Sequence, residues 1–195
     1  MTSSGSRTSF DKYFVYKKEF VVINGHSNVG KTTVALYLIA NSTVRHDWKW
    51  VIYSSENKTA SVKKLLMEFR HNKKVADMTH MERKAAYKWV LKHFVVISNK
   101  DLLSYTDVLI YTEKVMANSE VDGVFIDPYN SLRIDLAQSS LSSHEYHYEA
   151  ASEFLKLSKN RNVAIWVNMH AVTEAQRRKG DDGLPIAPFA EDTEG

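Results

Sequence analysis

The sequence predicts an α/β fold built on a mainly parallel, twisted sheet with helices on both faces. Five short apolar runs alternate with segments of helical periodicity, and this alternation is typical of right-handed βαβ crossovers. The apolar runs are nearly continuous rather than alternating, as strands covered on both faces require. The expected strands are residues 20–23, 48–53, 93–98, 123–127 and 163–168.

The segments between these runs carry helix signals. Apolar residues at i, i+3, i+4 and i+7 mark a helix around residues 62–69, and a similar stripe follows Ser104–Asp107. Thr79–Glu82 has the pattern of a capping box that opens a helix through about residue 92. The remaining helices are expected at 33–40 and in a segment ending near 159, and residues 41–47 are expected to be a polar connection.

Composition limits the function classes without choosing one. A chain of 195 residues with 44% hydrophobic and 25% charged residues is ordinary for one globular domain. The net charge of +3 permits a polyanionic partner but does not demand one. The absence of cysteine excludes disulfides and thiolate metal sites. No apolar run has the length of a membrane span, and the start lacks a signal peptide's apolar segment. A cytoplasmic protein is expected, because the lack of cysteine suits a reducing compartment.

One stretch directly after the first strand carries the strongest functional signal. It reads G-x4-G-K-T over Gly25, His26, Ser27, Asn28, Val29, Gly30, Lys31 and Thr32, and Thr33 directly after it is also expected to contact the nucleotide. Glycines let consecutive N–H groups point at phosphate oxygens, and the following helix N-terminus adds a favourable dipole. Lys31 can reach the β- and γ-phosphates, and the Thr32 hydroxyl can bind Mg²⁺. The alternative is an ordinary glycine-rich turn, which the strand and helix context disfavours. The sequence therefore predicts a site for ATP, or another nucleoside triphosphate, with Mg²⁺.

Three polar residues at later strand ends are candidates for the chemistry. Asp127 closes the fourth strand, where a carboxylate can hold Mg²⁺, although an Asp before Pro128 can also simply cap a turn. Glu56 follows the second strand and can deprotonate an attacking water, or it is a surface Glu. His170 follows the fifth strand and can contact the γ-phosphate, or it is a satisfied strand-end histidine.

Two further groups are weaker signals. Basic side chains at Arg133, Arg177, Arg178 and Lys179 lie in loops expected on the ligand side of the sheet, where they can contact a nucleic-acid backbone or simply remain in solvent. His144, Glu145 and His147 lack the H-E-x-x-H spacing, so they are assigned to a helix start without a metal.

Taken together, these motifs resemble the RecA-like motor domain of ring-shaped replicative helicases of the DnaB/Twinkle group, especially phage versions. Four stretches carry the resemblance: residues 25–33, 53–57, 124–130 and 168–174. The similarity runs from about residue 12 to the end, after a lead-in or linker at residues 1–11. The closing residues 190–195 look like the beginning of a further family motif.

The resemblance implies a RecA-like P-loop NTPase fold with strand order 3-2-4-5-1. It makes Glu56 the catalytic base and His170 the γ-phosphate sensor beside Lys31 and Asp127. It implies that the segments after Asp127 and His170, including a mobile loop at 171–195, face the channel of a hexamer and grip single-stranded DNA. It also implies an arginine finger from the neighbouring subunit, a primase as a partner, and a bacterial cytoplasm with either the bacterium or a phage encoding the protein.

The sequence departs from the family pattern by lacking the strand that carries the arginine finger and an N-terminal domain. The chain is therefore expected to be a fragment of a larger protein or a minimal relative, with weak or no activity of its own. Three alternatives stay open. A RecA- or RadA-like recombinase shares the core but forms filaments. A P-loop small-molecule kinase needs a lid with several arginines, and here only Arg177 and Arg178 are adjacent. A nucleotide-binding module without turnover is the third.

Overall fold

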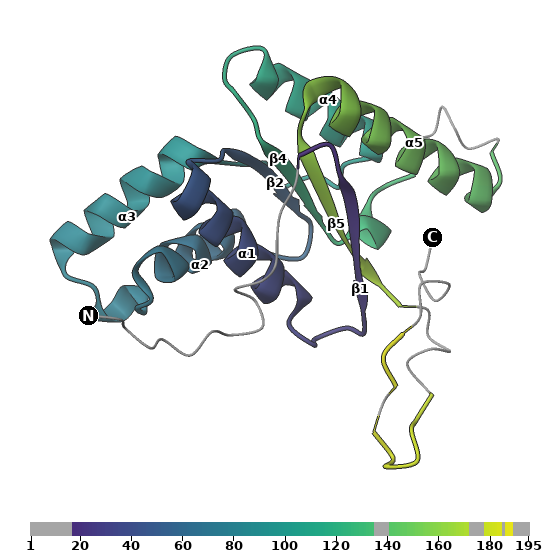
Figure 1. Ribbon diagram of the computed structural model, residues 1–195, viewed down its shortest axis with the longest axis horizontal. Coiled ribbons are helices and arrows are strands. Elements are labelled where there is room, and N and C mark those ends of the chain that lie inside the picture. Colours follow the sequence, from purple (N-terminus) through teal and green to yellow (C-terminus); the bar gives the residue numbers. More distant parts are fainter. Residues whose placement is uncertain (1–16, 135–140, 172–177, 185, 189–195) are drawn as a thin grey trace, which may run out of the picture.

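The computed structural model describes residues 17–134, 141–171, 178–184 and 186–188. Five strands and five α-helices form an α/β domain in these residues (Figure 1). In chain order they are β1 (Phe20–Gly25), α1 (Lys31–His46), β2 (Trp50–Ser54), α2 (Thr59–His71), α3 (His80–His93), β3 (Phe94–Val96), α4 (Tyr105–Met116), β4 (Gly123–Asp127), α5 (Ser143–Arg161) and β5 (Ala164–His170). Short 3-10 turns lie at η2 (Val75–Asp77) and η3 (Tyr129–Ser131). The expected lead-in at 1–11 and the closing stretch at 190–195 lie outside the described residues.

The five strands form one parallel sheet in the order β1-β5-β4-β2-β3. Counted from the β3 edge, this is 3-2-4-5-1, so the strand order implied by the resemblance is confirmed. The register places the strand ends beside one another: Ser54 pairs with Asp127, and Gly25 pairs with His170. The residues that follow or end β1, β2, β4 and β5 therefore share one edge of the sheet.

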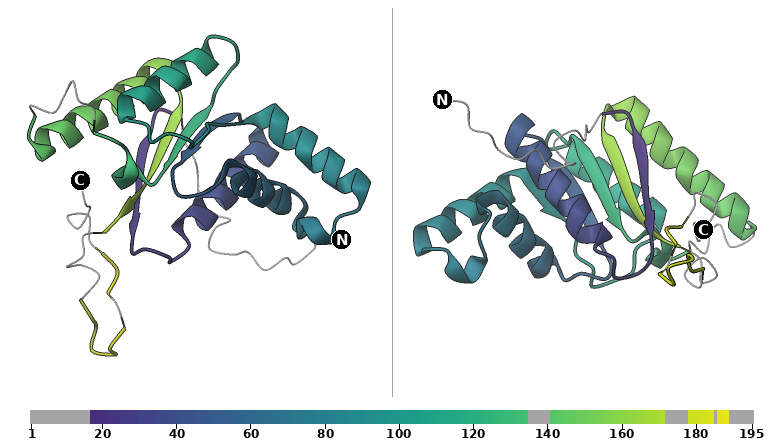
Figure 2. Two further views of the ribbon diagram at one scale, coloured as in Figure 1. Left: turned by 180° about the vertical axis from the view of Figure 1, so that it is seen from behind. Right: turned by 60° about the horizontal axis from the view of Figure 1, so that its bottom comes forward.

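Both faces of the sheet are covered, as the continuous apolar runs predicted. Alternate residues of β2 serve opposite sides, with Trp50 and Ile52 in the core below α1, α2 and α3, and Val51 and Tyr53 in the core below α4 and α5. Figures 1 and 2 show the two helical layers on either side of the sheet. At the start of β4, Gly123 is required because a Cβ there would overlap the Trp50 ring.

The helix starts follow their capping signals. Thr79 with Glu82 and Ser104 with Asp107 form complete capping boxes at α3 and α4, as predicted for the first pair and consistent with the helix start at the second. A third box, Ser142 with Glu145, opens α5 and was not predicted. In each box a backbone N–H left over at the helix start is satisfied by a side-chain oxygen.

The expected polar connection at residues 41–47 is wrong, because α1 continues through His46. The polar side chains return hydrogen bonds to the helix itself: Ser42 and Thr43 both donate to the Ile39 carbonyl, at 2.7 and 3.0 Å. Asp47 then ends the helix in a left-handed conformation, with Arg45 and His46 in the last turn, where positive charge is favourable.

Several predicted strand limits are also wrong. The segment 48–53 becomes β2 only from Trp50, because the aromatic Trp48 packs against Trp50 from the connection instead of pairing. The segment 93–98 contributes three residues to β3, since His93 completes α3 and its ring bonds the Trp89 carbonyl and Asp47. By contrast, β1 and β5 run two residues further than predicted at their carboxyl ends. In the described residues no helix is both long and apolar enough to cross a membrane.

Candidate nucleotide-binding site

The glycine-rich stretch forms a loop that joins β1 to α1. Asn28 and Gly30 have positive φ angles of 63° and 90°, which turn the backbone back toward the start of α1. Gly30 is the N-cap of α1 and its carbonyl accepts the Val34 N–H at 3.0 Å. The first amides of a 16-residue helix thus face the loop, which is the arrangement that favours an anion.

Lys31 lies folded over this loop. Its Nζ donates to the Gly25 carbonyl at 2.6 Å and to the His26 carbonyl at 2.8 Å. Burial lowers the pKa of the Lys31 ammonium, and the nearby carboxylates of Asp127 and Glu56 oppose this shift. The cation is therefore held at the mouth of the loop, between two acids from other strands.

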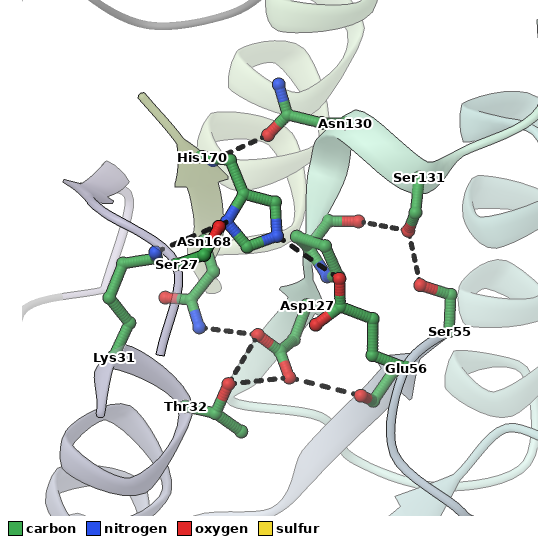
Figure 3. Close-up of polar contacts among 12 residues, drawn as sticks. Ser27, Lys31, Thr32, Ser55, Glu56, Asp127, Asn130, Ser131, Asn168 and His170 are labelled. Atoms are coloured by element: carbon green, nitrogen blue, oxygen red, sulfur yellow. Dashed lines mark hydrogen bonds and ion pairs between the residues drawn. The ribbon is translucent and has the colours of Figure 1, made fainter. Parts of the chain in front are cut away.

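Asp127 is the most heavily constrained side chain of the site, with 2% of its surface exposed. Thr32 Oγ1 donates to both carboxylate oxygens, at 2.8 and 3.0 Å, and Asn168 Nδ2 donates to Oδ1 at 2.6 Å (Figure 3). Ser54 Oγ and Asn57 Nδ2 donate to Oδ2 at 3.1 and 3.2 Å. Four donors from three other parts of the chain thus fix the carboxylate in one orientation.

Glu56 and His170 face each other across the same site (Figure 3). His170 Nε2 lies 3.2 Å from Glu56 Oε1, and the Glu56 side chain is 55% exposed. His170 Nδ1 lies 3.4 Å from both Lys31 Nζ and Ser27 Oγ. Because the ammonium can only donate, Nδ1 is the acceptor and Nε2 carries the proton that it donates to Glu56. The Asn130 side chain accepts the His170 backbone N–H at 2.7 Å and holds the strand end in place.

These side chains surround a cavity of about 460 Å³. Its lining comprises Ser27, Asn28, Gly30, Lys31, Thr32, Thr33, Glu56, Asn57, Leu65, Asp127 and His170. The structure therefore brings together all four residues proposed for catalysis with the phosphate loop. Glu56 and Asp127 lie on the same edge of the sheet, since β2 and β4 are neighbours.

The basic candidates are spread over two segments. Arg133 lies after η3, where Nη2 donates to Asp107 at 3.1 Å, so it is an ion-pair partner at the start of α4. Arg178 and Lys179 are exposed at the start of a tight turn closed by hydrogen bonds from Gly180 to Leu184 and from Gly183 to Gly180. Arg177 lies outside the described residues.

This turn contacts the phosphate loop. His26 Nε2 donates to the Ile186 carbonyl at 2.9 Å, while the Ile186 N–H donates to the Arg178 carbonyl at 3.1 Å. In Figure 1 the turn (yellow) projects away from the sheet below β5. His26 therefore joins the basic turn to the loop that holds Lys31.

His147 and Glu145, at the start of α5, have structural partners. His147 Nδ1 lies 2.8 Å from the Tyr129 hydroxyl, and burial lowers the pKa of its imidazole. Glu145 belongs to the capping box of α5. The assignment of this group to a helix start is confirmed.

Sequence reasoning missed the residues that support the two acids. Ser54, Asn57 and Asn168 all bond Asp127. Ser54 and Asn57 lie at or just after the end of β2, whereas Asn168 lies inside β5. Asn168 is fully buried in β5. The signal available in the sequence was a polar residue that interrupts an apolar run. Asn99, which contacts the Glu56 loop from beyond the end of β3, carried no such signal.

Comparisons with known proteins bear on the fold of this chain. No family model matches the sequence. The chloroplastic/mitochondrial Twinkle homolog protein of Arabidopsis thaliana is 24% identical over 194 residues, which cover 94% of this chain and 27% of that protein. The chain thus spans about a quarter of the length of this curated relative.

Two solved structures share the architecture. One is an ATPase domain that superposes with a TM-score of 0.67 at 17% identity, over 91% of this chain and 64% of the other. A DnaB-like replicative helicase, whose structure was described together with its interactions with primase, gives a TM-score of 0.66 at 16% identity, over 92% and 46%. The chain therefore has the fold of a DnaB-like helicase ATPase domain, and the RecA-like fold that the resemblance implied is confirmed.

Proposed function

We propose that this chain is the ATP-hydrolysing motor domain of a replicative DNA helicase, which moves along single-stranded DNA and separates the duplex as a ring. One observation carries the proposal: Lys31, Thr32, Glu56, Asp127 and His170, from four strand ends, line a single cavity. The likeness in fold to DnaB-like ATPase domains and the similarity to a Twinkle homolog support the choice among nucleotide hydrolases.

The residues present fit a magnesium–triphosphate complex. The Thr32 hydroxyl and the Asp127 carboxylate lie 2.8 Å apart, and both are the hard oxygen donors that Mg²⁺ prefers. The loop from Gly25 to Thr33 would hold the phosphates with its amides, and Lys31 would hold them with its ammonium. When bound, Mg²⁺ supplies charge neutralisation at the phosphate oxygens.

The protein's own groups then divide the work. The Lys31 ammonium donates to the Gly25 and His26 carbonyls, and with a nucleotide bound it would donate to phosphate oxygens instead. The Glu56 carboxylate is exposed enough to meet a water molecule, orients it, and accepts its proton. His170 touches Glu56 through one ring nitrogen and Lys31 through the other, so a change at the γ-phosphate reaches both groups.

The proposal includes binding partners, of which the first is single-stranded DNA. The phosphates of single-stranded DNA would be contacted, without any reading of the base sequence, by four basic residues: Arg133, Arg177, Arg178 and Lys179. Arg177 lies outside the described residues. The His26–Ile186 contact links this turn to the nucleotide loop. We further propose assembly into a hexamer, an arginine finger from the neighbouring subunit, a primase as a partner, and a bacterial cytoplasm as the location.

The deciding experiment measures phosphate release from ATP with and without single-stranded DNA. We expect DNA to stimulate release, and Lys31→Ala to lower it roughly 100- to 1,000-fold, because a charge that stabilises the transition state is lost. Lys156→Ala is the matched control, since this exposed lysine pairs with Glu153 on α5 and lies outside the cavity. Turnover by Lys31→Ala at the normal rate would contradict the proposal.

The alternatives give different products. Phosphate transferred to a small acceptor instead of water identifies a kinase, and filaments on DNA in electron micrographs identify a recombinase. A fluorescent ATP analogue that binds without any hydrolysis identifies a module without turnover.

A further inference from the structure

We propose that Asn99 is a positioning residue for Glu56, and this inference rests on the role of Glu56 given above. Asn99 lies after β3, at the outer edge of the sheet and outside the lining of the nucleotide cavity. Its amide Nδ2 donates to the Ser55 carbonyl at 3.3 Å and to the Asn57 carbonyl at 3.1 Å. The two hydrogens of one amide group thus bind the carbonyls on either side of the dipeptide Glu56–Asn57. We call this pair of hydrogen bonds the Asn99 bracket.

The bracket matters because the Glu56 side chain has little packing of its own. It is 55% exposed and meets His170 at 3.2 Å. The direction of such a side chain is set mainly by the backbone beneath it. A misplacement of about 1 Å in a reacting group can lower a rate on the order of 100-fold.

Other hydrogen bonds of this loop hold its two ends, in addition to the bond from the Asn57 side chain to Asp127. The Ser55 N–H donates to the Asp127 carbonyl at 3.0 Å, and the Ser55 hydroxyl bonds the Ser131 hydroxyl (Figure 3). The Asn57 N–H donates to Ser54 Oγ at 3.2 Å. The two Ser55 bonds tie the loop to β4 and η3 on its inner side, and the Asn57 bond ties it to the end of β2. Asn99 holds the loop from the β3 side.

The bracket also explains what the short edge strand contributes. Only three residues of β3 pair with β2, and the Ile97 N–H adds one more bond, to the Ile52 carbonyl at 2.8 Å. This pairing fixes the chain two residues before Asn99. Edge strand β3 therefore positions the Asn99 side-chain amide beside the loop that follows β2.

The test compares Asn99→Ala and Asn99→Asp in the assembled protein on single-stranded DNA. Both variants lack the two donors, and the second also places a carboxylate against two carbonyls. We expect kcat for ATP hydrolysis to fall roughly 10- to 100-fold, with the larger loss in Asn99→Asp, while Kd for a fluorescent ATP analogue stays within about twofold. Asn118→Ala is the matched control, because Asn118 makes the same kind of amide-to-carbonyl bond, to Lys114 at 3.0 Å, beyond the end of α4.

A double-mutant cycle separates positioning from general support of the fold. If Asn99 acts through Glu56, Asn99→Ala in a Glu56→Gln background lowers kcat no further than Glu56→Gln alone. Full additivity of the two losses would overturn the inference, as would a loss of ATP-analogue affinity equal to the loss of kcat.

The inference and the proposed function fail in different ways. Normal kcat in Asn99→Ala, with Glu56→Gln inactive, overturns the role of Asn99 alone. Normal kcat in Glu56→Gln overturns the role of Glu56, and with it both proposals.

Discussion

The ends of two neighbouring strands, β4 and β2, present an acid in opposite ways. Asp127 ends β4, is 2% exposed, and accepts hydrogen bonds from Thr32, Ser54, Asn57 and Asn168. Glu56 follows β2 and is 55% exposed, and within the described residues its carboxylate contacts the His170 ring. The two acids lie close together, because they come from adjacent strands whose last residues pair. Their burial and their hydrogen bonding nevertheless differ strongly.

The difference matches two kinds of chemistry. A carboxylate that binds a metal ion with strict geometry works best when fixed, and several donors keep Asp127 in one orientation. A carboxylate that takes a proton from water must meet water, and its support has to come from the backbone. The fixed orientation of Asp127 thus suits the proposed metal ligand, and the exposure of Glu56 suits the proposed base.

The largest effect is expected for Asp127→Asn, which should abolish hydrolysis and also destabilise the fold. The new NH2 group would place donors against either the donor of Asn168 or the donors of Ser54 and Asn57, in a buried site. Leaving a buried polar group unsatisfied costs about 1–3 kcal/mol, so the free energy of unfolding should fall by about that amount in urea titrations. Asp122→Asn, just before the other end of β4, should lose stability yet keep hydrolysis, because Asp122 bonds Lys49 and Lys17 far from the cavity. An Asp127→Asn variant as stable as wild type would contradict the assigned difference between a constrained Asp127 and an exposed Glu56.

A purely catalytic effect is expected for Glu56→Gln. Turnover should fall roughly 100- to 10,000-fold because the base is lost. The free energy of unfolding should stay within about 0.5 kcal/mol of wild type, since the side chain is exposed, and ATP-analogue binding should persist. Glu120→Gln serves as the control, as that glutamate is 91% exposed and distant. Wild-type turnover in Glu56→Gln would remove the assigned role.

The smallest effect is expected at Glu82, an acid with a structural role. The backbone N–H of Thr79, and then Lys73, lower the pKa of its carboxyl to about 2 from the ordinary 4.5. Because the folded pKa is depressed, the stabilisation is complete above about pH 4.5 and is lost as the pH falls toward 2. Thermal melts of Glu82→Ala should therefore lie slightly below wild type at pH 7, with a gap that narrows in acid. Hydrolysis at pH 7 should be unchanged, and a gap that widens in acid would contradict the assignment.

Much of the site was predictable because its signals are local. The glycine loop, Asp127 and His170 each stand beside an apolar strand, and a parallel sheet brings strand ends to one edge whatever the details of packing. The capping box at Thr79 was predictable for the same reason, since its partners lie three residues apart. The 41–47 segment was mispredicted because Ser42 and Thr43 resemble loop residues in the sequence, while in the fold they bond back to Ile39.

The sequence by itself determined the fold class, the phosphate loop and the acids at the strand ends, because these depend on periodicity and on neighbours along the chain. Only the tertiary structure decided which side chains support those acids. Asn168 reaches Asp127 across 41 positions and Asn99 reaches Ser55 across 44, and contacts over such separations depend on the order and register of the strands. That order joins β2 to β4 and β3, so the two acids and their different supports meet at one place.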